Sequence, residues 1–147
     1  MLMLATASFS SADLVLFNHS PSIPIGLYVR DRADLRPGVI VTVRARDVAP
    51  EIARLRDYDD PNDRFIKHVA AIGGQSVCAD GRALSIDGVQ AAVIYRASGQ
   101  PMPAAWLGCR RLAADEVLLL GDSPDSFDGR YWGPINARFI EGVWRKL

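Results

Sequence analysis

The sequence predicts a mainly β fold, a barrel or sandwich of short antiparallel strands with one or two short helices. Short apolar runs rich in β-branched residues recur along the chain, and turns containing glycine or proline separate them. Apolar residues make up 49% of the 147 residues, enough for a hydrophobic core within a single domain. The chain shows no fixed-period repeat and no low-complexity run.

The strands are expected from local composition. Residues 39–43 (VIVTV) are β-branched and follow a Pro-Gly turn, and residues 116–120 (EVLLL) have the length and composition of a buried strand. Asp87-Gly88 is a hairpin signal between two further strands. The other expected strands are residues 14–17, 26–29, 65–72, 76–78, 83–86, 89–95 and 139–144.

One segment reads as a helix. Residues 47–55 (DVAPEIARL) have helical character, with Pro50 in a first-turn position. Residues 56–64 are polar and rich in turn formers, which predicts a surface loop. Residues 97–108 contain two prolines and two glycines and are expected to form a surface excursion.

The N-terminal segment, residues 1–17, is apolar and leads into the first strand, and residues 18–147 form one domain. A membrane-spanning helix needs about 20 apolar residues, whereas this run is interrupted at residues 10–13 and carries no basic residue at its start. Three interpretations stay open: the remnant of a membrane anchor, a weak interfacial segment, or a buried strand. For residues 14–17 we expect a buried strand.

Charge and cysteine content limit the partners. Lys+Arg and Asp+Glu are both 17, so the net charge is zero and we expect no nucleic acid partner. The two histidines lie far apart and neither cysteine belongs to a CxxC motif, so we expect no metal and no other cofactor. From the residues alone, Cys78 and Cys109 could form a disulfide or remain two buried thiols.

Two serines flank a proline in residues 18–28 (NHSPSIPIGLY). Pro21 and Pro24 disfavour a helix, and in an extended chain Ser20 and Ser22 point to one face. One hydroxyl could then attack a carbonyl while the other donates a hydrogen bond. The alternative is an ordinary loop rich in serine and proline.

A serine nucleophile needs a base, and Lys67 lies within the apolar run of residues 65–72. Burial disfavours the charged form of lysine and lowers its pKa, so that a buried lysine can accept a proton. His68 points to the opposite face of the strand and cannot share the site with Lys67. The alternative is an edge-strand lysine whose amine reaches solvent.

A polar loop, residues 121–135 (GDSPDSFDGRYWGPI), follows the buried strand 116–120. A serine hydroxyl there could bond a lysine amine, and an aspartate–arginine pair could brace the loop. A polar surface loop without function is the alternative. The residues concerned are Asp122, Asp125, Ser126, Asp128 and Arg130.

In this order, the three segments resemble the signal peptidase I superfamily of serine–lysine peptidases, and within it the TraF-like conjugative-transfer branch. The resemblance covers residues 18–135 and rests on three motifs. They are Ser22-Ile23-Pro24-Ile25-Gly26-Leu27-Tyr28, then Lys67-His68-Val69 with Gly73-Gly74, then Gly121-Asp122 with Ser126-Phe127-Asp128-Gly129-Arg130-Tyr131-Trp132-Gly133.

The resemblance implies a role for each matching residue. Ser22 is the nucleophile and Lys67 the general base, and the Ser20 hydroxyl and the Ser22 amide form the oxyanion hole. Ser126 positions the lysine, and the supporting residues are Asp122, Asp128 and Arg130. The chain departs from the pattern at His68 (usually Arg), Gly73-Gly74-Gln75 (usually Pro-Gly-Asp), Ser123-Pro124 (usually Asn-Arg) and Gly129 (usually Ser).

The implied fold is a signal-peptidase-like β-rich barrel or sandwich. The implied function is a serine endopeptidase that cleaves, or cleaves and cyclises, a pilin-like or secreted precursor for conjugative transfer or type IV secretion. Its partners would be the precursor polypeptide and the surface of the bacterial inner membrane, with the catalytic domain facing the periplasm. A non-catalytic assembly module that keeps this fold is the alternative.

The resemblance also implies a disulfide between Cys78 and Cys109 in an oxidising compartment, with Cα atoms about 4.4–6.8 Å apart. A self-cleaving LexA-like regulator also uses serine and lysine, but no helix-turn-helix pattern precedes Ser22 in this sequence.

Overall fold

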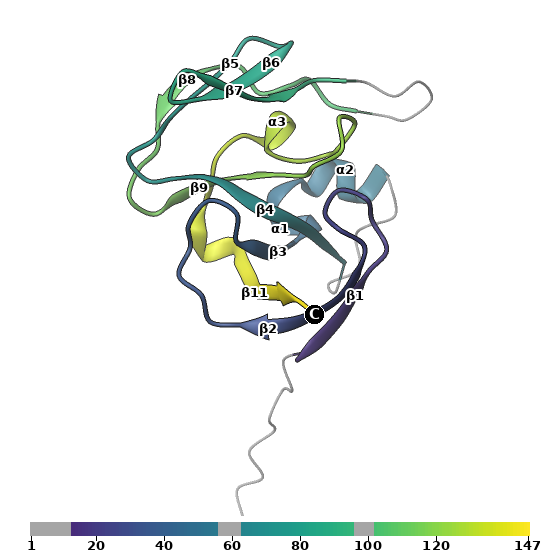
Figure 1. Cartoon of the computed structure of the whole chain (residues 1–147). Helices are drawn as coiled ribbons and strands as arrows, with labels where there is room; N and C mark the ends of the chain where they lie inside the picture. The colour runs from purple at the N-terminus through teal and green to yellow at the C-terminus, as the bar shows by residue number, and fades with distance from the viewer. Residues whose placement is uncertain (1–12, 56–62, 96–101) are drawn as a thin grey trace, which may run out of the picture.

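The computed structural model describes residues 13–55, 63–95 and 102–147. Within these ranges the fold is mainly β, with two antiparallel sheets and a few short helices (Figure 1). The predicted fold class is confirmed. The segment 1–12 and most of the predicted loop 56–64 lie outside the described residues, as do residues 97–101 of the predicted excursion.

The larger sheet has seven strands in the order β1-β2-β11-β3-β4-β9-β10, and the smaller has four in the order β7-β6-β5-β8. The strands of the larger sheet are β1 (Val15–Asn18), β2 (Gly26–Asp31), β3 (Ile40–Arg44), β4 (Arg64–Ile72), β9 (Glu116–Leu120), β10 (Ile135–Asn136) and β11 (Ile140–Lys146). Those of the smaller sheet are β5 (Ser76–Ala79), β6 (Ala83–Ile86), β7 (Val89–Val93) and β8 (Gly108–Arg111).

The described helices are short: α1 (Ala45–Val48), α2 (Pro50–Leu55), α3 (Gly129–Trp132) and the 3₁₀ helix η1 (Ala137–Phe139). The predicted helix 47–55 is thus two helices that meet at Ala49. Pro50 disfavours helical backbone in the residue before it, and Pro50 itself suits a first helical position because it has no N–H to leave unbonded. The sequence prediction missed α3, which lies within the predicted polar loop.

Strand β4 lies inside the larger sheet, between β3 and β9. Its side chains alternate between faces, and Lys67, Val69 and Ala71 are the buried ones. Strand β9 is buried from Val117 to Leu120, as its composition predicts. The alternative that Lys67 sits on an edge strand with its amine in solvent is therefore wrong.

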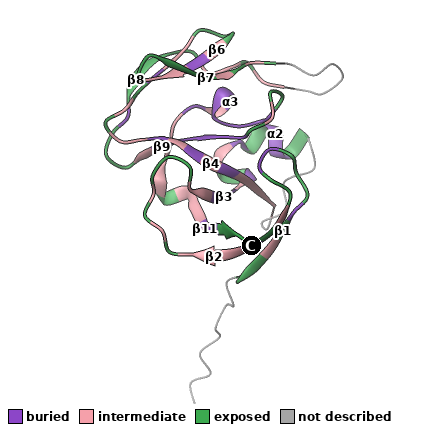
Figure 2. Ribbon diagram, viewed as in Figure 1, coloured by how far each residue is buried: buried purple, intermediate pink, exposed green. Residues whose placement is uncertain are grey.

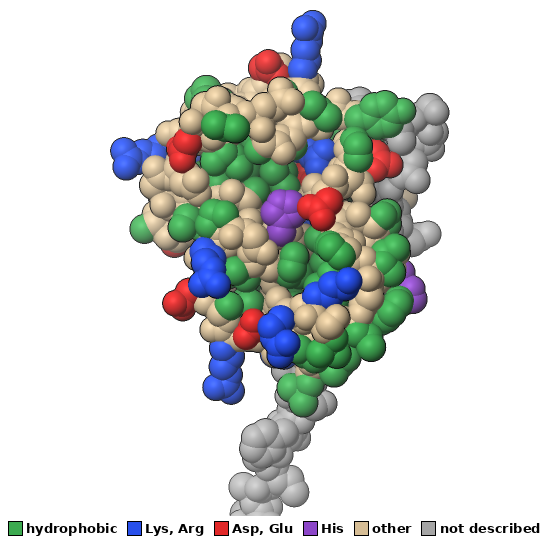
Figure 3. Space-filling view, viewed as in Figure 1, with side chains coloured by type: hydrophobic (Ala, Val, Ile, Leu, Met, Phe, Trp, Pro, Cys, Tyr) green, Lys and Arg blue, Asp and Glu red, His purple; other side chains and the backbone are tan. Residues whose placement is uncertain are grey.

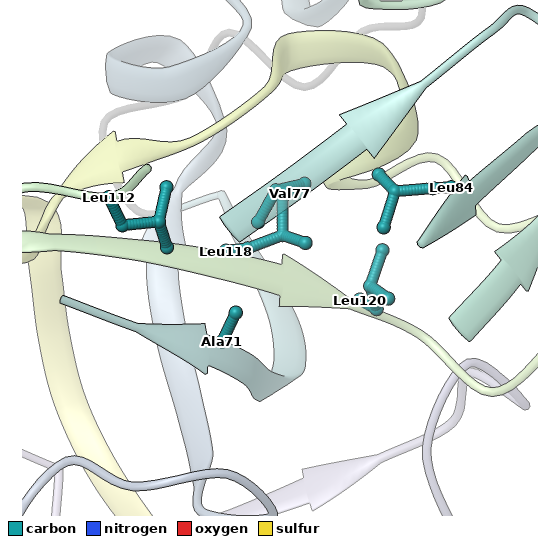
Figure 4. Close-up of a cluster of buried hydrophobic side chains, with 6 residues drawn as sticks. All are labelled: Ala71, Val77, Leu84, Leu112, Leu118 and Leu120. Carbon is teal, nitrogen blue, oxygen red and sulfur yellow. The ribbon is translucent and has the colours of Figure 1, made fainter. Parts of the chain in front are cut away.

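The smaller sheet covers the part of the larger sheet formed by β4 and β9 (Figure 1). Between them lies a cluster of buried apolar side chains, shown in Figure 4, with members from both sheets: Ala71, Val77, Leu84, Leu112, Leu118 and Leu120. Figure 2 shows β9 and α3 buried over most of their length. The β6–β7 hairpin turns at Asp87 and Gly88, both with positive φ, as a two-residue Asp-Gly turn requires.

The first strand forms as predicted, but the expectation that it is buried is wrong. Strand β1 is an edge strand, and Leu14, Val15 and Phe17 are 72%, 52% and 50% exposed. Only the inward side chain of Leu16 packs against a buried cluster, which contains Ile23. No helix in the described ranges is long and apolar enough to cross a bilayer.

The end of the predicted excursion is also more structured than expected. Residues 108–111 form β8, which pairs with β5, and the Trp106 amide donates a hydrogen bond to the carbonyl of Arg130 at 2.9 Å. Trp106 packs against the core cluster. These contacts join segments distant in sequence, so local composition could not reveal them.

Candidate active site

Ser20 and Ser22 lie in the connection between β1 and β2. Their hydroxyl oxygens are 2.9 Å apart, and the Ser22 amide donates to Ser20 Oγ at 3.3 Å. Ser22 is buried, with 6% of its surface exposed. Because the amide uses a lone pair of the Ser20 oxygen, the hydroxyl hydrogen of Ser20 stays available for donation.

Lys67 is 5% exposed and comes from the middle of β4. Its Nζ donates a hydrogen bond to Ser126 Oγ at 3.0 Å, and the bond is buried. Ser126 belongs to the loop after β9, and it too is buried. The structure thus brings together a lysine and a serine that are 59 positions apart.

Gly121 lies between the two serines. A Cβ built on Gly121 would overlap Ser126 Oγ and would lie 2.9 Å from Ser22 Cβ. Ser22 and Ser126 therefore approach one point from different segments, and Lys67 bonds the second of them. Sequence reasoning placed Gly121 in a motif but gave it no role. Its only signal was a glycine directly after a buried strand.

The loop after β9 also holds the backbone of the serine loop. The Asp122 amide donates to the Ser22 carbonyl at 2.5 Å, and Ser123 Oγ donates to the Pro21 carbonyl at 3.0 Å. Asp122 thus reaches the serine loop with its backbone, while its carboxylate is more than half exposed.

Asp128 and Arg130 form a buried ion pair, 0% and 2% exposed, with Nη2 and Oδ2 3.0 Å apart. Asp128 Oδ2 also accepts from the Gly121 amide at 2.7 Å. Arg130 donates to four backbone carbonyls in the loop and on β7, those of Gly121, Ser123, Pro124 and Val93. A buried ion pair with such additional bonds is well satisfied and fixes the loop that carries Ser126.

His68 points away from Lys67 and contacts Asp122, with Nδ1 3.2 Å from Oδ1. Burial lowers the pKa of His68 below its ordinary value, and the negative charge of Asp122 opposes this with a smaller effect.

His68 and Asp122 also line a cleft of about 460 Å³ that Gly121, Gln90, Val93 and Pro124 border. Figure 3 shows a histidine beside an acidic side chain in a hollow of this face.

Cys78 and Cys109 form a disulfide between β5 and β8, where they are direct cross-strand partners. Their Cα atoms are 4.0 Å apart, which is shorter than the expected range. Directly opposed residues of an antiparallel pair approach to about 4.5 Å, so their position accounts for a Cα spacing at the short end of the range but not for the remaining difference.

These residues supply the parts of an acyl-transfer site: a serine hydroxyl, a buried amine bonded to a second serine, and two neighbouring donors.

The sequence prediction also gave no role to Asn18, whose buried side chain bonds the serine loop. Its position directly before the loop was the only signal.

Comparison with known proteins finds a matching family model, similar sequences and a similar solved structure. The family model described as signal peptidase, peptidase S26, matches residues 1–146. A plasmid transfer protein TraF of Escherichia coli is 30% identical over an alignment of 162 positions, gaps included, which covers 99% of this chain and 88% of the relative. A probable conjugal transfer protein TraF of Sinorhizobium fredii is 29% identical, covering 100% and 85%. The crystal structure of a signal peptidase I from Enterococcus faecalis matches with a TM-score of 0.45 and 18% identity, covering 77% of this chain and 98% of the other.

Proposed function

The chain belongs to the signal peptidase family, peptidase S26, and from this premise we propose that it is a serine endopeptidase with Ser22 as nucleophile and Lys67 as general base. We propose that its substrate is a pilin-like or secreted precursor polypeptide of a conjugative transfer or type IV secretion system. The names of its relatives, plasmid and conjugal transfer proteins, support the transfer setting. The observation that carries the proposal is that Ser22 and Ser126 both lie against Gly121, and that the buried amine of Lys67 bonds Ser126.

The reaction begins with Ser22 Oγ attacking the carbonyl carbon of the scissile bond while Lys67 Nζ takes its proton. Burial of Lys67 supports this role, because removing the amine from water disfavours its charged form. A neutral amine that donates one hydrogen to Ser126 Oγ has two remaining positions for its second hydrogen and its lone pair, so the bond narrows the directions in which the lone pair can point. Lys67 then gives the proton to the leaving amine.

The oxyanion of the tetrahedral intermediate is stabilised by the Ser20 hydroxyl and the Ser22 amide. The two donors are neighbours, since the amide now bonds Ser20 Oγ at 3.3 Å. A substrate oxygen entering between them replaces this long bond with two bonds to itself. Each oxyanion donor contributes about 3–4 kcal/mol to transition-state stabilisation.

The acyl-enzyme, an ester of Ser22, reacts in one of two ways. Water attacks the ester with Lys67 as base, which releases a shortened chain. Alternatively, the amino group of the substrate attacks, which releases a cyclic polypeptide. The mass of the product, which differs by one water, separates the two outcomes.

We further propose that the enzyme works at the periplasmic surface of the inner membrane. The Cys78–Cys109 disulfide supports an oxidising compartment. The outer face of β1 and β2 supports a lipid surface as partner, because large apolar side chains are exposed on it and residues 1–9 (MLMLATASF), which precede it, are apolar. The exposed residues are Leu14, Val15, Phe17, Ile25 and Leu27.

Liposome flotation tests this surface. The Phe17→Ser/Leu27→Ser double variant, altered at two cross-strand partners, should float with anionic vesicles less than the wild type. Val89→Ser, at an exposed apolar position on β7, is the matched control and should float like the wild type. Equal flotation of all three proteins would remove the β1–β2 face as the contact.

Cleavage of a co-expressed pilin precursor from the same transfer system tests the peptidase. The wild type should convert the precursor, and Ser22→Ala should leave it intact. Ser76→Ala removes an exposed hydroxyl at the start of β5 and should cleave normally. Conversion by Ser22→Ala would rule out Ser22 as the nucleophile, and no conversion by the wild type would favour the non-catalytic assembly module.

A further inference from the structure

We propose that Asn18 is a positioning residue that holds the loop Ser20–Pro24 in the conformation that Ser20 and Ser22 need; this inference rests on the proposed function. The Asn18 side chain is buried, with 4% of the residue exposed. Its Nδ2 donates to the carbonyls of Ser20 at 2.8 Å and of Ile23 and Pro24 at 3.2 Å each. Its Oδ1 accepts from the Ser20 amide at 3.0 Å.

The loop needs a donor from outside because of its own composition. Pro21 and Pro24 have no N–H, so the loop has few donors with which to close a turn on itself. Asn18 is the last residue of β1 and pairs with Gly26, the first of β2. Its side chain therefore lies at the base of the loop, where a carboxamide provides both donor hydrogens and an acceptor.

The carbonyls from Ser20 to Pro24 all accept a hydrogen bond. Asn18 serves three of them, and Tyr28 Oη adds a second donor to Pro24 at 2.6 Å. The loop after β9 serves the other two, those of Pro21 and Ser22. The supports therefore divide along the loop: among the described residues Asn18 alone bonds the Ser20 carbonyl, Tyr28 shares Pro24 with it, and the loop after β9 bonds Pro21 and Ser22.

This division predicts how loss of Asn18 affects the reaction. Asn18→Ala should release the Ser20 end of the loop and leave the bonds to Pro21 and Ser22 in place. The Ser20 hydroxyl would then lose its alignment with the Ser22 amide. We expect kcat to fall by at most the factor that loss of one oxyanion donor costs, about 10²–10³-fold, with KM little changed.

A double-mutant cycle with Ser20→Ala tests the inference on the full chain. If Asn18 acts by positioning Ser20, the double variant Asn18→Ala/Ser20→Ala should cleave the precursor no more slowly than Ser20→Ala alone. Asn136→Ala is the matched control: half-buried Asn136 also accepts from the amide two residues on, that of Arg138, and donates to Asp115, but both bonds are exposed to solvent. It should leave kcat unchanged.

Amide hydrogen exchange gives a readout that does not need activity. Asn18 does not touch the Ser22 amide, yet exchange at Ser22 should speed up in Asn18→Ala, because the loop that aligns it is released. Should Asn18→Ala fail to fold, Asn18→Ser, which keeps a short donor and acceptor, takes its place in both experiments.

The outcomes separate this inference from the proposed function. An unchanged kcat in Asn18→Ala, rate losses that multiply in the double variant, or unchanged exchange at Ser22 would each overturn the positioning role. If the wild type does not cleave the precursor, the peptidase proposal fails, and the exchange measurement still decides whether Asn18 holds the loop.

Discussion

Lys67 Nζ donates a buried hydrogen bond to Ser126 Oγ across 3.0 Å. If this bond orients the base, Ser126→Ala should lower kcat by about 10²-fold while precursor binding stays near the wild-type level. The measurement is steady-state cleavage by purified protein, with Ser76→Ala as the control. A Ser126→Ala enzyme with wild-type kcat would show that the bond is only structural.

Gly121 is expected to tolerate no side chain. In Gly121→Ala the new methyl group would overlap Ser126 Oγ and crowd Ser22 Cβ, so both serines must shift. Overpacking of this kind costs about 1–3 kcal/mol, and we expect activity to be lost as well. Thermal unfolding and cleavage are measured on one preparation. The second variant, Gly121→Ala/Ser126→Gly, removes the overlap with Ser126 but not that with Ser22, so it should regain part of the stability and none of the activity. A fully active Gly121→Ala would contradict this account of the site.

His68 should make stability depend on pH. Burial lowers its pKa in the folded protein, so the unfolded chain binds a proton at a higher pH than the folded chain does. The free energy of unfolding therefore falls as the pH drops below about 6.5, the ordinary value, and on through the lowered pKa of His68.

His68→Gln does not titrate, and its Tm should change less between about pH 7 and about pH 5 than that of the wild type. His19→Gln replaces the other histidine of the chain and should behave like the wild type. If both variants kept the wild-type dependence on pH, His68 would not be its source.

The disulfide should be present in protein taken from the periplasm. Alkylation without reductant should label neither Cys78 nor Cys109, and mass spectrometry detects this directly. The bridge spans 31 positions, and in the entropy model closing a loop of this length stabilises the fold by about 3–4 kcal/mol. Cys78→Ser/Cys109→Ser should therefore unfold at lower denaturant concentration. Two alkylated thiols would argue against the periplasm.

The sequence predicted best where local pattern and long-range packing agree. Strands β6 and β9 have the predicted bounds. The two-residue Asp-Gly turn fixes the end of β6, and a continuous apolar run marks β9. Composition failed for β1, which is apolar yet exposed at a sheet edge. It also failed for β8 and α3, which depend on pairing with β5 and on capping by Asp128.

The same contrast holds for the candidate site. The family resemblance pointed to Ser22, Lys67 and Ser126 because motifs preserve residue types in order. Gly121 stood in a motif without a role and Asn18 in none, because the importance of both residues comes from what surrounds them. Gly121 matters through two serines from different segments, and Asn18 through carbonyls of a loop whose prolines leave it short of donors.

The role of Lys67 as base is tested most directly by precursor cleavage over a range of pH. The chain has two lysines, Lys67 and Lys146, which offers a matched pair of variants. Arginine stays protonated at any working pH, so Lys67→Arg should be inactive throughout, whereas Lys146→Arg should match the wild type, whose rate rises with pH as the amine loses its proton. Substantial cleavage by Lys67→Arg would contradict the serine–lysine mechanism.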